Sequence, residues 1–336
     1  MITTKVIKRP ASKILALFVA LFALSQTGCG PTYPKEILDK AIIQLCREEY
    51  NVEVKVKIIG STIGVYIPLE GLFDATLNIS RKAADKINDV MLSTSRVALS
   101  SDAPMNFYIV VAQDPLLPEI EVVLVRYIRD IKMLHYTQIS RGEFSKRMMI
   151  DIKLTPQAQK EKVLRDIFGR LNIEEADDLI EEYLKTSEVT SIGDIGYWND
   201  TFYMKDIYMG EFLALQTADR IKRKLATTPS LREDFKLNLI KGEFLEEGGK
   251  FFFRFSFNVS PLDQEALFIN NEALDNVYDA ILEEAALVLH GYKFNDFWNI
   301  EIVDVVSNQV LFATSDELEA HRKKKMKLEE FRRWYR

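Results

Sequence analysis

The order of strand and helix patterns along the chain constrains its fold more than any other feature, because the same order occurs twice. The first set is a hairpin, a helix and two buried strands, at residues 51–70, 80–99, 107–112 and 120–125. The second set has the same order, at residues 235–259, 271–290, 300–306 and 310–312. Apolar residues that alternate with polar ones predict the strands, and apolar residues at helical spacing predict the helices.

We therefore predict an α+β fold with two ββαββ-type modules separated by a mainly helical insert. Internal duplication is one explanation of the recurrence. The independent origin of two similar segments is the other, because the two sets share few identical residues. The expected regions are the first module at 35–139, the insert at 140–230, the second module at 231–314 and a basic C-terminal helix at 315–336. Within the insert, helices are expected at 143–150, 156–169, 174–185 and 206–225.

The first 28 residues have the pattern of a secretory signal. Four basic residues precede an unbroken apolar run at 14–24, and small and polar residues follow it up to Gly28 and Cys29. Eleven apolar residues are too few to cross the hydrocarbon of a membrane, which takes about 20 in a helix. A basic start, a short apolar centre and a small-residue exit are typical of a cleaved signal peptide.

With Cys29 directly after Gly28, this segment resembles the signal peptide of bacterial lipoproteins. The resemblance implies cleavage before Cys29 and acylation of its thiol and its new amino group, palmitate included. Residues 29–34 would then form a short lipidated linker. Gly30 stands where lipoproteins retained in the inner membrane often carry Asp, so we expect an outer-membrane location facing the periplasm. No named family is recognised for the mature chain.

The mature chain is acidic. Removal of residues 1–28 reduces the 44 Lys and Arg to 40, against 50 Asp and Glu. This balance argues against a nucleic-acid partner, because such binding depends on neutralising phosphates. If Cys29 is acylated, Cys46 has no partner for an internal disulfide, and its place among apolar residues of a helix predicts burial.

The sequence carries no motif of a known catalytic centre. Phosphate-binding glycine loops, nucleophile elbows and His or Cys pairs at metal-ligand spacing are all missing from it. We therefore expect no catalytic residue, no metal and no cofactor.

The stretch from 191 to 206 combines aromatic rings with acids and amides. Rings that stack on a sugar or peptide, beside carboxylates that accept its hydrogens, form a recognition site. We therefore take this stretch as a candidate ligand site, and the alternative is that the rings turn inward and seal the seam between insert and modules. The candidate residues are Asp194, Tyr197, Trp198, Asp200 and Tyr203.

The C-terminal tail concentrates positive charge in an acidic protein. Its sequence from 321 to 336 has eight Lys and Arg against two Glu, with aromatic residues among them. Such asymmetry favours contact with an anionic surface, such as lipid headgroups or another envelope component. Pairing of these cations with the acidic body of the protein is the alternative. The candidate contact residues are Lys323, Lys324, Lys325, Arg332, Arg333 and Trp334.

These features together predict a lipid-anchored cell-envelope protein that is non-catalytic and acts as a binding or assembly module at the membrane surface. The alternative is an envelope hydrolase or carbohydrate-active enzyme that uses carboxylates near 194–206. The element order over 73–114 loosely resembles the peptidoglycan-anchoring domain of outer-membrane proteins. The Asp and Arg motif with which such domains bind peptidoglycan is missing here, so that activity is not carried over.

Overall fold

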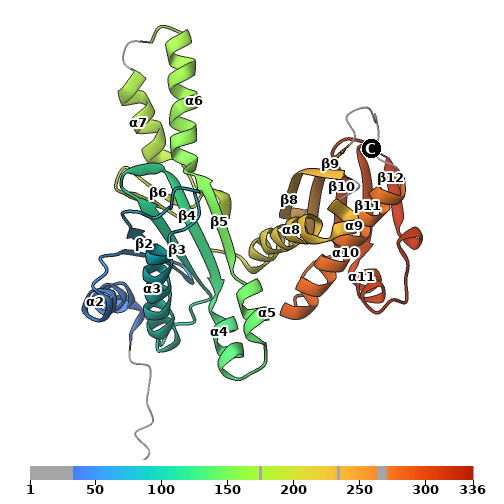
Figure 1. Cartoon of the computed structure of the whole chain (residues 1–336), viewed down its shortest axis with the longest axis horizontal. Coiled ribbons are helices and arrows are strands. Elements are labelled where there is room, and N and C mark those ends of the chain that lie inside the picture. Colours follow the sequence, from blue (N-terminus) through green and yellow to red (C-terminus); the bar gives the residue numbers. More distant parts are fainter. Residues whose placement is uncertain (1–32, 174–175, 233–234, 263–270, 336) are drawn as a thin grey trace, which may run out of the picture.

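A computed structural model describes residues 33–173, 176–232, 235–262 and 271–335 (Figure 1). The expected signal peptide, 1–28, and Cys29 lie outside these residues. The fold mixes helices with three β-sheets across the described residues, two five-stranded and one two-stranded. Within those ranges, no helix has the length and apolar character needed to span a membrane.

The first module extends further into the sequence than expected. Its elements are η1 (Lys35–Ile37), α2 (Leu38–Tyr50), β1 (Lys55–Ile59), β2 (Thr62–Pro68), α3 (Arg81–Leu99), β3 (Phe107–Asp114), β4 (Leu117–Tyr127), α4 (Ile128–His135), α5 (Arg141–Lys146) and β5 (Met149–Leu154). The strands lie in the order β1-β2-β3-β4-β5, and only β2 and β3, which α3 connects, run parallel. The helix expected over 143–150 is therefore wrong at its end, because Met149 begins the fifth strand of this sheet.

Local sequence signals explain several boundaries of this module. The hydroxyl of Ser80 accepts a hydrogen bond from the amide of Ala83 and so caps α3, as its place before an apolar stripe predicts. Asn51 ends α2 in the left-handed conformation that asparagine tolerates. Gly60, with φ +58°, makes the turn between β1 and β2, where a Cβ atom would overlap the carboxylate of Asp206.

The insert is a helical pair followed by a small hairpin. Its elements are α6 (Pro156–Arg170), α7 (Ala176–Thr186), η2 (Ile192–Asp194), β6 (Gly196–Trp198) and β7 (Thr201–Tyr203). The pair α6–α7 projects from one end of the first module (Figure 1). The segment from 192 to 207 returns across the sheet of that module, where its apolar side chains join the core.

The second module repeats the strand order of the first. Its elements are α8 (Met209–Thr227), α9 (Pro229–Arg232), β8 (Phe235–Glu247), β9 (Lys250–Pro261), α10 (Asn271–Tyr292), β10 (Asn299–Asp304), β11 (Gln309–Thr314), α11 (Ser315–Arg322), η3 (Leu328–Glu330) and β12 (Arg332–Tyr335). The strands lie in the order β12-β11-β10-β9-β8, and again only the two strands on either side of the crossing helix, β9 and β10, run parallel.

The C-terminal helix expected over 315–336 is wrong beyond Arg322. Lys324 adopts a left-handed conformation, with φ +56°, and ends α11 without the glycine that usually marks such a stop. The chain then turns through η3, and β12 pairs antiparallel with β11. The tail is thus the edge strand of the second sheet.

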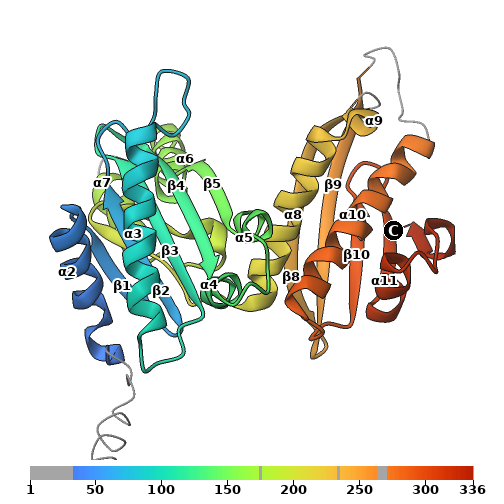
Figure 2. The ribbon, with the colours of Figure 1, turned by 60° about the horizontal axis from the view of Figure 1, so that its bottom comes forward.

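The apolar core has two parts (Figure 2). One lies between the helix layer α2–α3 and one face of the first sheet. The other is continuous from the opposite face of that sheet, through α8 and α10, to the second sheet. The buried rings of Phe107 on β3 and Phe212 on α8, with centroids 5.1 Å apart, connect the two modules. Cys46 on α2 is buried, as predicted.

Candidate functional site

The aromatic residues of the segment 191–206 face inward. The ring of Tyr197 stacks on that of Tyr66 with centroids 3.5 Å apart, and its hydroxyl bonds with Lys55 and Asp200. Tyr203 is 6% exposed and donates a hydrogen bond to the carbonyl of Leu184. These rings therefore seal the seam between the insert and the first sheet, which is the alternative that the sequence left open.

Trp198 is half-buried in the same seam. Its indole nitrogen is buried and has no hydrogen-bond partner in the described parts of the chain. The indole is therefore only partly accessible to a ligand.

The acids of this segment have separate partners. Asp194 accepts hydrogen bonds from the amide and hydroxyl of Ser191 and caps η2. Asp200 pairs with Lys55 at 3.0 Å, and the hydrogen bond from that lysine lowers the pKa of Asp200. Asp206 accepts from the amide of Ser61 and the hydroxyl of Thr62. Each of these three carboxylates is thus occupied by partners from the protein itself.

A buried glutamate on β4, Glu121, went unnoticed in the sequence, although it interrupts the apolar run at 120–125. Its side chain accepts a hydrogen bond from the amide of Tyr197 and lies 3.7 Å from Lys153. Burial raises the pKa of Glu121 to about 7. A Cβ atom on Gly196 would lie 2.5 Å from its Oε1 atom, so no substrate has room there. We assign Glu121 a structural role for this reason.

Several cations of the tail are neutralised within the protein. Arg322 and Lys323 pair with Glu319 at 2.7 and 3.0 Å, and these contacts lower the pKa of Glu319 to about 2, the hydrogen bond from Arg322 contributing most. Arg333 pairs with Asp275 at 2.8 Å.

The other candidate contact residues of the tail do not share one element, because Lys324 and Lys325 follow α11 and Arg332 begins β12. Lys324, Lys325 and Arg332 are exposed, and the side chain of Trp334 lies outside what the structure describes. The eight cations are not held on one helix, because the tail contains a helix, a turn and a strand.

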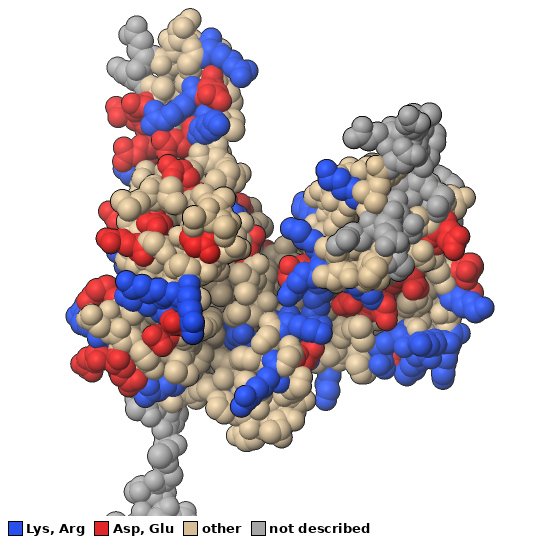
Figure 3. All heavy atoms as spheres, in the orientation of Figure 1, with Lys and Arg blue, Asp and Glu red and all other residues tan. Residues whose placement is uncertain are grey.

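The structure instead reveals a cleft between the two modules, which we call the inter-module cleft. It encloses about 240 Å³ between β5 of the first sheet, β8 of the second sheet, α8 and the η2 turn. Figure 3 shows the molecule hollowed between its two lobes. Both β5 and β8 are edge strands of their sheets.

The cleft runs along the edges of these strands. Three consecutive residues of β5, Met149 to Asp151, line it, and so do three consecutive residues of β8, Ile240 to Gly242. Because successive side chains of a strand point to opposite faces, a cavity over one face would contact only every second residue. Met149, Asp151 and Lys153 are every second residue of β5 and share one face with Val123 of β4, so the cavity lies mainly over that face, beside the edge where β5 has unpaired N–H and C=O groups.

Some of the charged groups that line the cleft already bind other groups of the protein. Lys153 donates to the carbonyls of Gly193 and Ile195 at 2.6 and 2.9 Å, and Lys241 pairs with Glu243 at 2.7 Å. Lys222 forms no ion pair among the described residues. The exposed apolar side chain of Ile150 supplies the apolar part of the β5 wall.

A buried ionic contact also joins the two modules. Arg147, which follows α5, binds Asp130 of the first module at 2.9 Å and the carbonyl of Gly291 in α10 at 3.1 Å. Its guanidinium lies 4.4 Å from the ring centre of Tyr292, whose hydroxyl donates to Asp130. Because this buried cation contacts both modules, their separation would cost its hydrogen bond to Gly291 and its contact with the ring of Tyr292.

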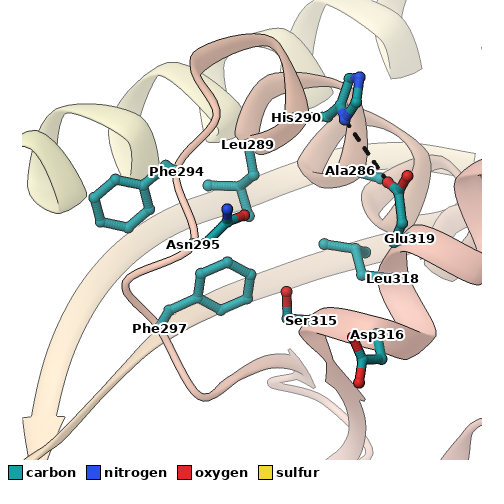
Figure 4. A pocket seen from close by; sticks show the side chains of 10 residues that line it. All are labelled: Ala286, Leu289, His290, Phe294, Asn295, Phe297, Ser315, Asp316, Leu318 and Glu319. Carbon is teal, nitrogen blue, oxygen red and sulfur yellow. Dashed lines mark ion pairs between the residues drawn. The ribbon is translucent and has the colours of Figure 1, made fainter.

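Each module also has a hollow at the end of its crossing helix. In the second module it encloses about 460 Å³ beside α10 and the start of α11, and His290, Asp316 and Glu319 contribute its charged or titratable groups (Figure 4). In the first module the corresponding hollow encloses about 300 Å³ beside α3 and the start of α4, with Arg129 and Lys132. The same place in the two modules thus carries groups of opposite charge.

In comparisons with known proteins, no protein family, curated protein or solved structure matches the chain. Within the described ranges, no cluster of three or more His, Cys, Asp or Glu has the geometry of a metal site.

Proposed function

We propose that the mature protein is a lipid-anchored, non-catalytic binding module of the cell envelope that takes an extended polypeptide in the inter-module cleft. The observation that carries this proposal is that two edge strands, β5 and β8, both line the cleft. A strand with a free edge binds an extended segment through main-chain hydrogen bonds, and neighbouring side-chain pockets supply selectivity. The partner is accordingly another envelope protein that presents an extended, partly apolar segment.

The signal sequence and the start of the fold support the anchor. Gly28 and Cys29 end the signal pattern, and the backbone of Tyr33 already bonds with Ser100 and Asp102 of the first module. Cys29→Ser should abolish acylation and release the protein or leave the precursor uncleaved. Metabolic labelling with radioactive palmitate and membrane fractionation measure both effects, and unchanged labelling in the variant would refute the anchor. The same fractionation tests the proposed outer-membrane location.

The same strand order in both modules supports a further part of the proposal, that the two ββαββ modules arose by internal duplication. The correspondence includes the preceding helix, α2 or α8, and the fifth strand, β5 or β12. A crystal structure in which the two sheets failed to superpose strand by strand would contradict it.

Peptide selection tests the cleft. Peptides of about ten residues, long enough to follow a strand edge, are selected from a random library on the unacylated mature chain. We expect Ile150→Glu to weaken their binding by at least about tenfold, because it removes apolar contact in the cleft. Leu92→Glu is the matched control, since Leu92 is about as exposed but lies on α3.

Methylation of the peptide backbone distinguishes strand pairing from side-chain binding alone. N-methyl groups at alternate amides should abolish binding when they lie on an edge of the peptide that pairs with β5 or β8. Equal binding of the methylated peptides and of the parent peptide would refute strand addition.

A further inference from the structure

One face of the first module lies next to the start of the fold. Tyr33 forms a β-bridge with Ser101, its amide donates to the carbonyl of Ser100 at 3.2 Å, and its carbonyl accepts from the amide of Asp102 at 3.2 Å. Cys29 precedes Tyr33 by four residues, and an extended chain of that length spans at most about 14 Å. An acyl anchor on Cys29 therefore keeps this face close to the membrane surface.

The positively charged hollow of the first module lies on that face. Ser101, the bridge partner of Tyr33, lines it together with Arg129 and Lys132 of α4. Both cations are exposed, and neither has an ion-pair partner among the residues that the structure describes. Tyr136 follows at the end of α4 and is 73% exposed.

The hollow of the second module does not carry the positive charge of the hollow in the first module. The corresponding hollow of the second module carries Asp316 and Glu319, and most of the cations near it are already bound to acids. Among the residues that the structure describes, Lys and Arg without an ion-pair partner therefore line this hollow in the first module and not in the second. Lys and Arg side chains also gather over α4 and α5 in Figure 3.

We propose that Arg129, Lys132 and Tyr136 form a membrane-contact surface that binds the anionic headgroups of the membrane in which Cys29 is anchored. Each cation near an anionic surface contributes to attraction, and an exposed tyrosine suits the interface because its ring is apolar and its hydroxyl is polar. The inference rests on the proposed lipid anchor and adds an orientation to it. The pair α6–α7 projects from the opposite end of the first module and so points away from the membrane (Figure 1).

Lysine footprinting on vesicles tests this orientation. The chain from Cys29 onward is coupled through its Cys29 thiol to a maleimide lipid, and Cys46 stays unlabelled because it is buried. Acetylation of Lys132 is compared with that of Lys162, an exposed lysine of α6 that forms no ion pair within the described residues. We expect Lys132 to react about fivefold more slowly on phosphatidylglycerol vesicles than on phosphatidylcholine vesicles. Lys162 should react equally on both.

Two variants and a salt series complete the test. Arg129→Glu should remove the protection of Lys132, and Arg170→Glu, which changes an exposed arginine at the end of α6, should leave it intact. Protection should also disappear at about 1 M salt, where screening shortens electrostatic range. Equal acetylation of Lys132 on both vesicle types, or protection that survives Arg129→Glu, would overturn the inference.

Because the chain is coupled chemically to the lipid, the footprint of Lys132 can be measured independently of the acylation of Cys29 in cells. Loss of palmitate labelling in cells would refute the proposed acylation without changing the footprint of the coupled chain. An unprotected Lys132 on the coupled chain would refute the membrane-contact surface without changing the labelling of Cys29.

Discussion

The two five-stranded sheets share one strand order but bury their strands differently. Every residue of β3 in the first sheet is buried, and its sequence is a continuous apolar run from Phe107 to Ala112. In the second sheet, buried phenylalanines of β9 alternate with half-exposed residues such as Arg254 and Ser256. Both faces of the first sheet are thus covered at β3. At β9 only one face of the second sheet is fully buried.

The insert accounts for the difference. Phe202 and Met204 of the insert pack closely over Gly64 on β2, on the face opposite α2 and α3. On the corresponding face of the second sheet, Arg254 pairs with Glu301 at 2.7 Å. The same strand order is therefore compatible with both burial patterns. A strand whose two faces are covered has a continuous apolar run, and a strand with one covered face alternates apolar and polar residues.

The largest effect is expected from removal of the fifth strand of the second sheet. Deletion of residues 328–336 removes β12 and the buried side chains of Leu328 and Phe331. The lost burial should lower the free energy of unfolding by about 3–6 kcal/mol. Urea unfolding measures the change, and Lys324→Ala with Lys325→Ala is the control because both lysines are exposed. A deletion that unfolds like the parent would show that the tail is not part of the sheet.

The cover of the first sheet can be broken at Tyr197. Tyr197→Ala removes a buried ring stacked on Tyr66 and should cost about 3–5 kcal/mol. Phe251→Ala in the second sheet should cost no more than about 1.5 kcal/mol, because Phe251 is 37% exposed. Thermal and urea unfolding of both variants test the contrast, which equal costs would contradict.

Glu121, which lies beneath the insert segment that contains Tyr197, should make the stability of the fold depend on pH. Burial raises the pKa of Glu121 in the folded chain to about 7, above its ordinary value of 4.5, so the folded state binds the proton more tightly. This contribution is fully present below about pH 4.5 and is lost as the pH rises through 7. Glu121→Gln should therefore raise the free energy of unfolding at pH 8 by up to about 3 kcal/mol and leave it almost unchanged at pH 4.5. Urea unfolding at the two pH values measures this, with the exposed Glu70→Gln as control; a gain equal at both pH values would contradict the assignment.

The smallest expected effect compares Gly64 and Ser256, which lie on β2 and β9 at the second face of each sheet. A Cβ atom on Gly64 would lie 2.5 Å from the sulfur of Met204, so Gly64→Ser should destabilise the fold by about 1–3 kcal/mol. Ser256→Gly should cost less than about 1 kcal/mol, mainly in backbone entropy. If Gly64→Ser proved neutral under urea unfolding, the close cover of the first sheet would be disproved.

Local patterns were sufficient to predict most elements of both modules. The alternation in β8 and β9, the apolar runs of β3 and β4 and the Ser80 cap all specify their structures through neighbouring residues. Strand β5 was missed although Ile150, Ile152 and Leu154 alternate with Asp151 and Lys153, because the preceding helix was extended to residue 150 and 151–155 were left unassigned. Unusually, its apolar row is the exposed one.

The cleft and the end of the tail depend on contacts that a local pattern does not contain. Met149–Leu154 and Phe235–Glu247 are separated by about eighty residues, and only the packing of α8 brings their edges together. The tail stops being helical at Lys324, which adopts a conformation that sequence signals associate with glycine. Its cations had looked available because their carboxylate partners, Glu319 and Asp275, belong to elements whose relative positions the sequence does not reveal.

The position of Arg147 has a consequence for how the chain matures. In the order of synthesis, Arg147 emerges long before Gly291 and Tyr292, which complete its surroundings. Until the last third of the chain arrives, the first half holds a cation that lacks one of its acceptors and the ring beside it. The two halves are therefore expected to reach their final form together, so that a prematurely terminated chain would present an unfinished surface to proteases.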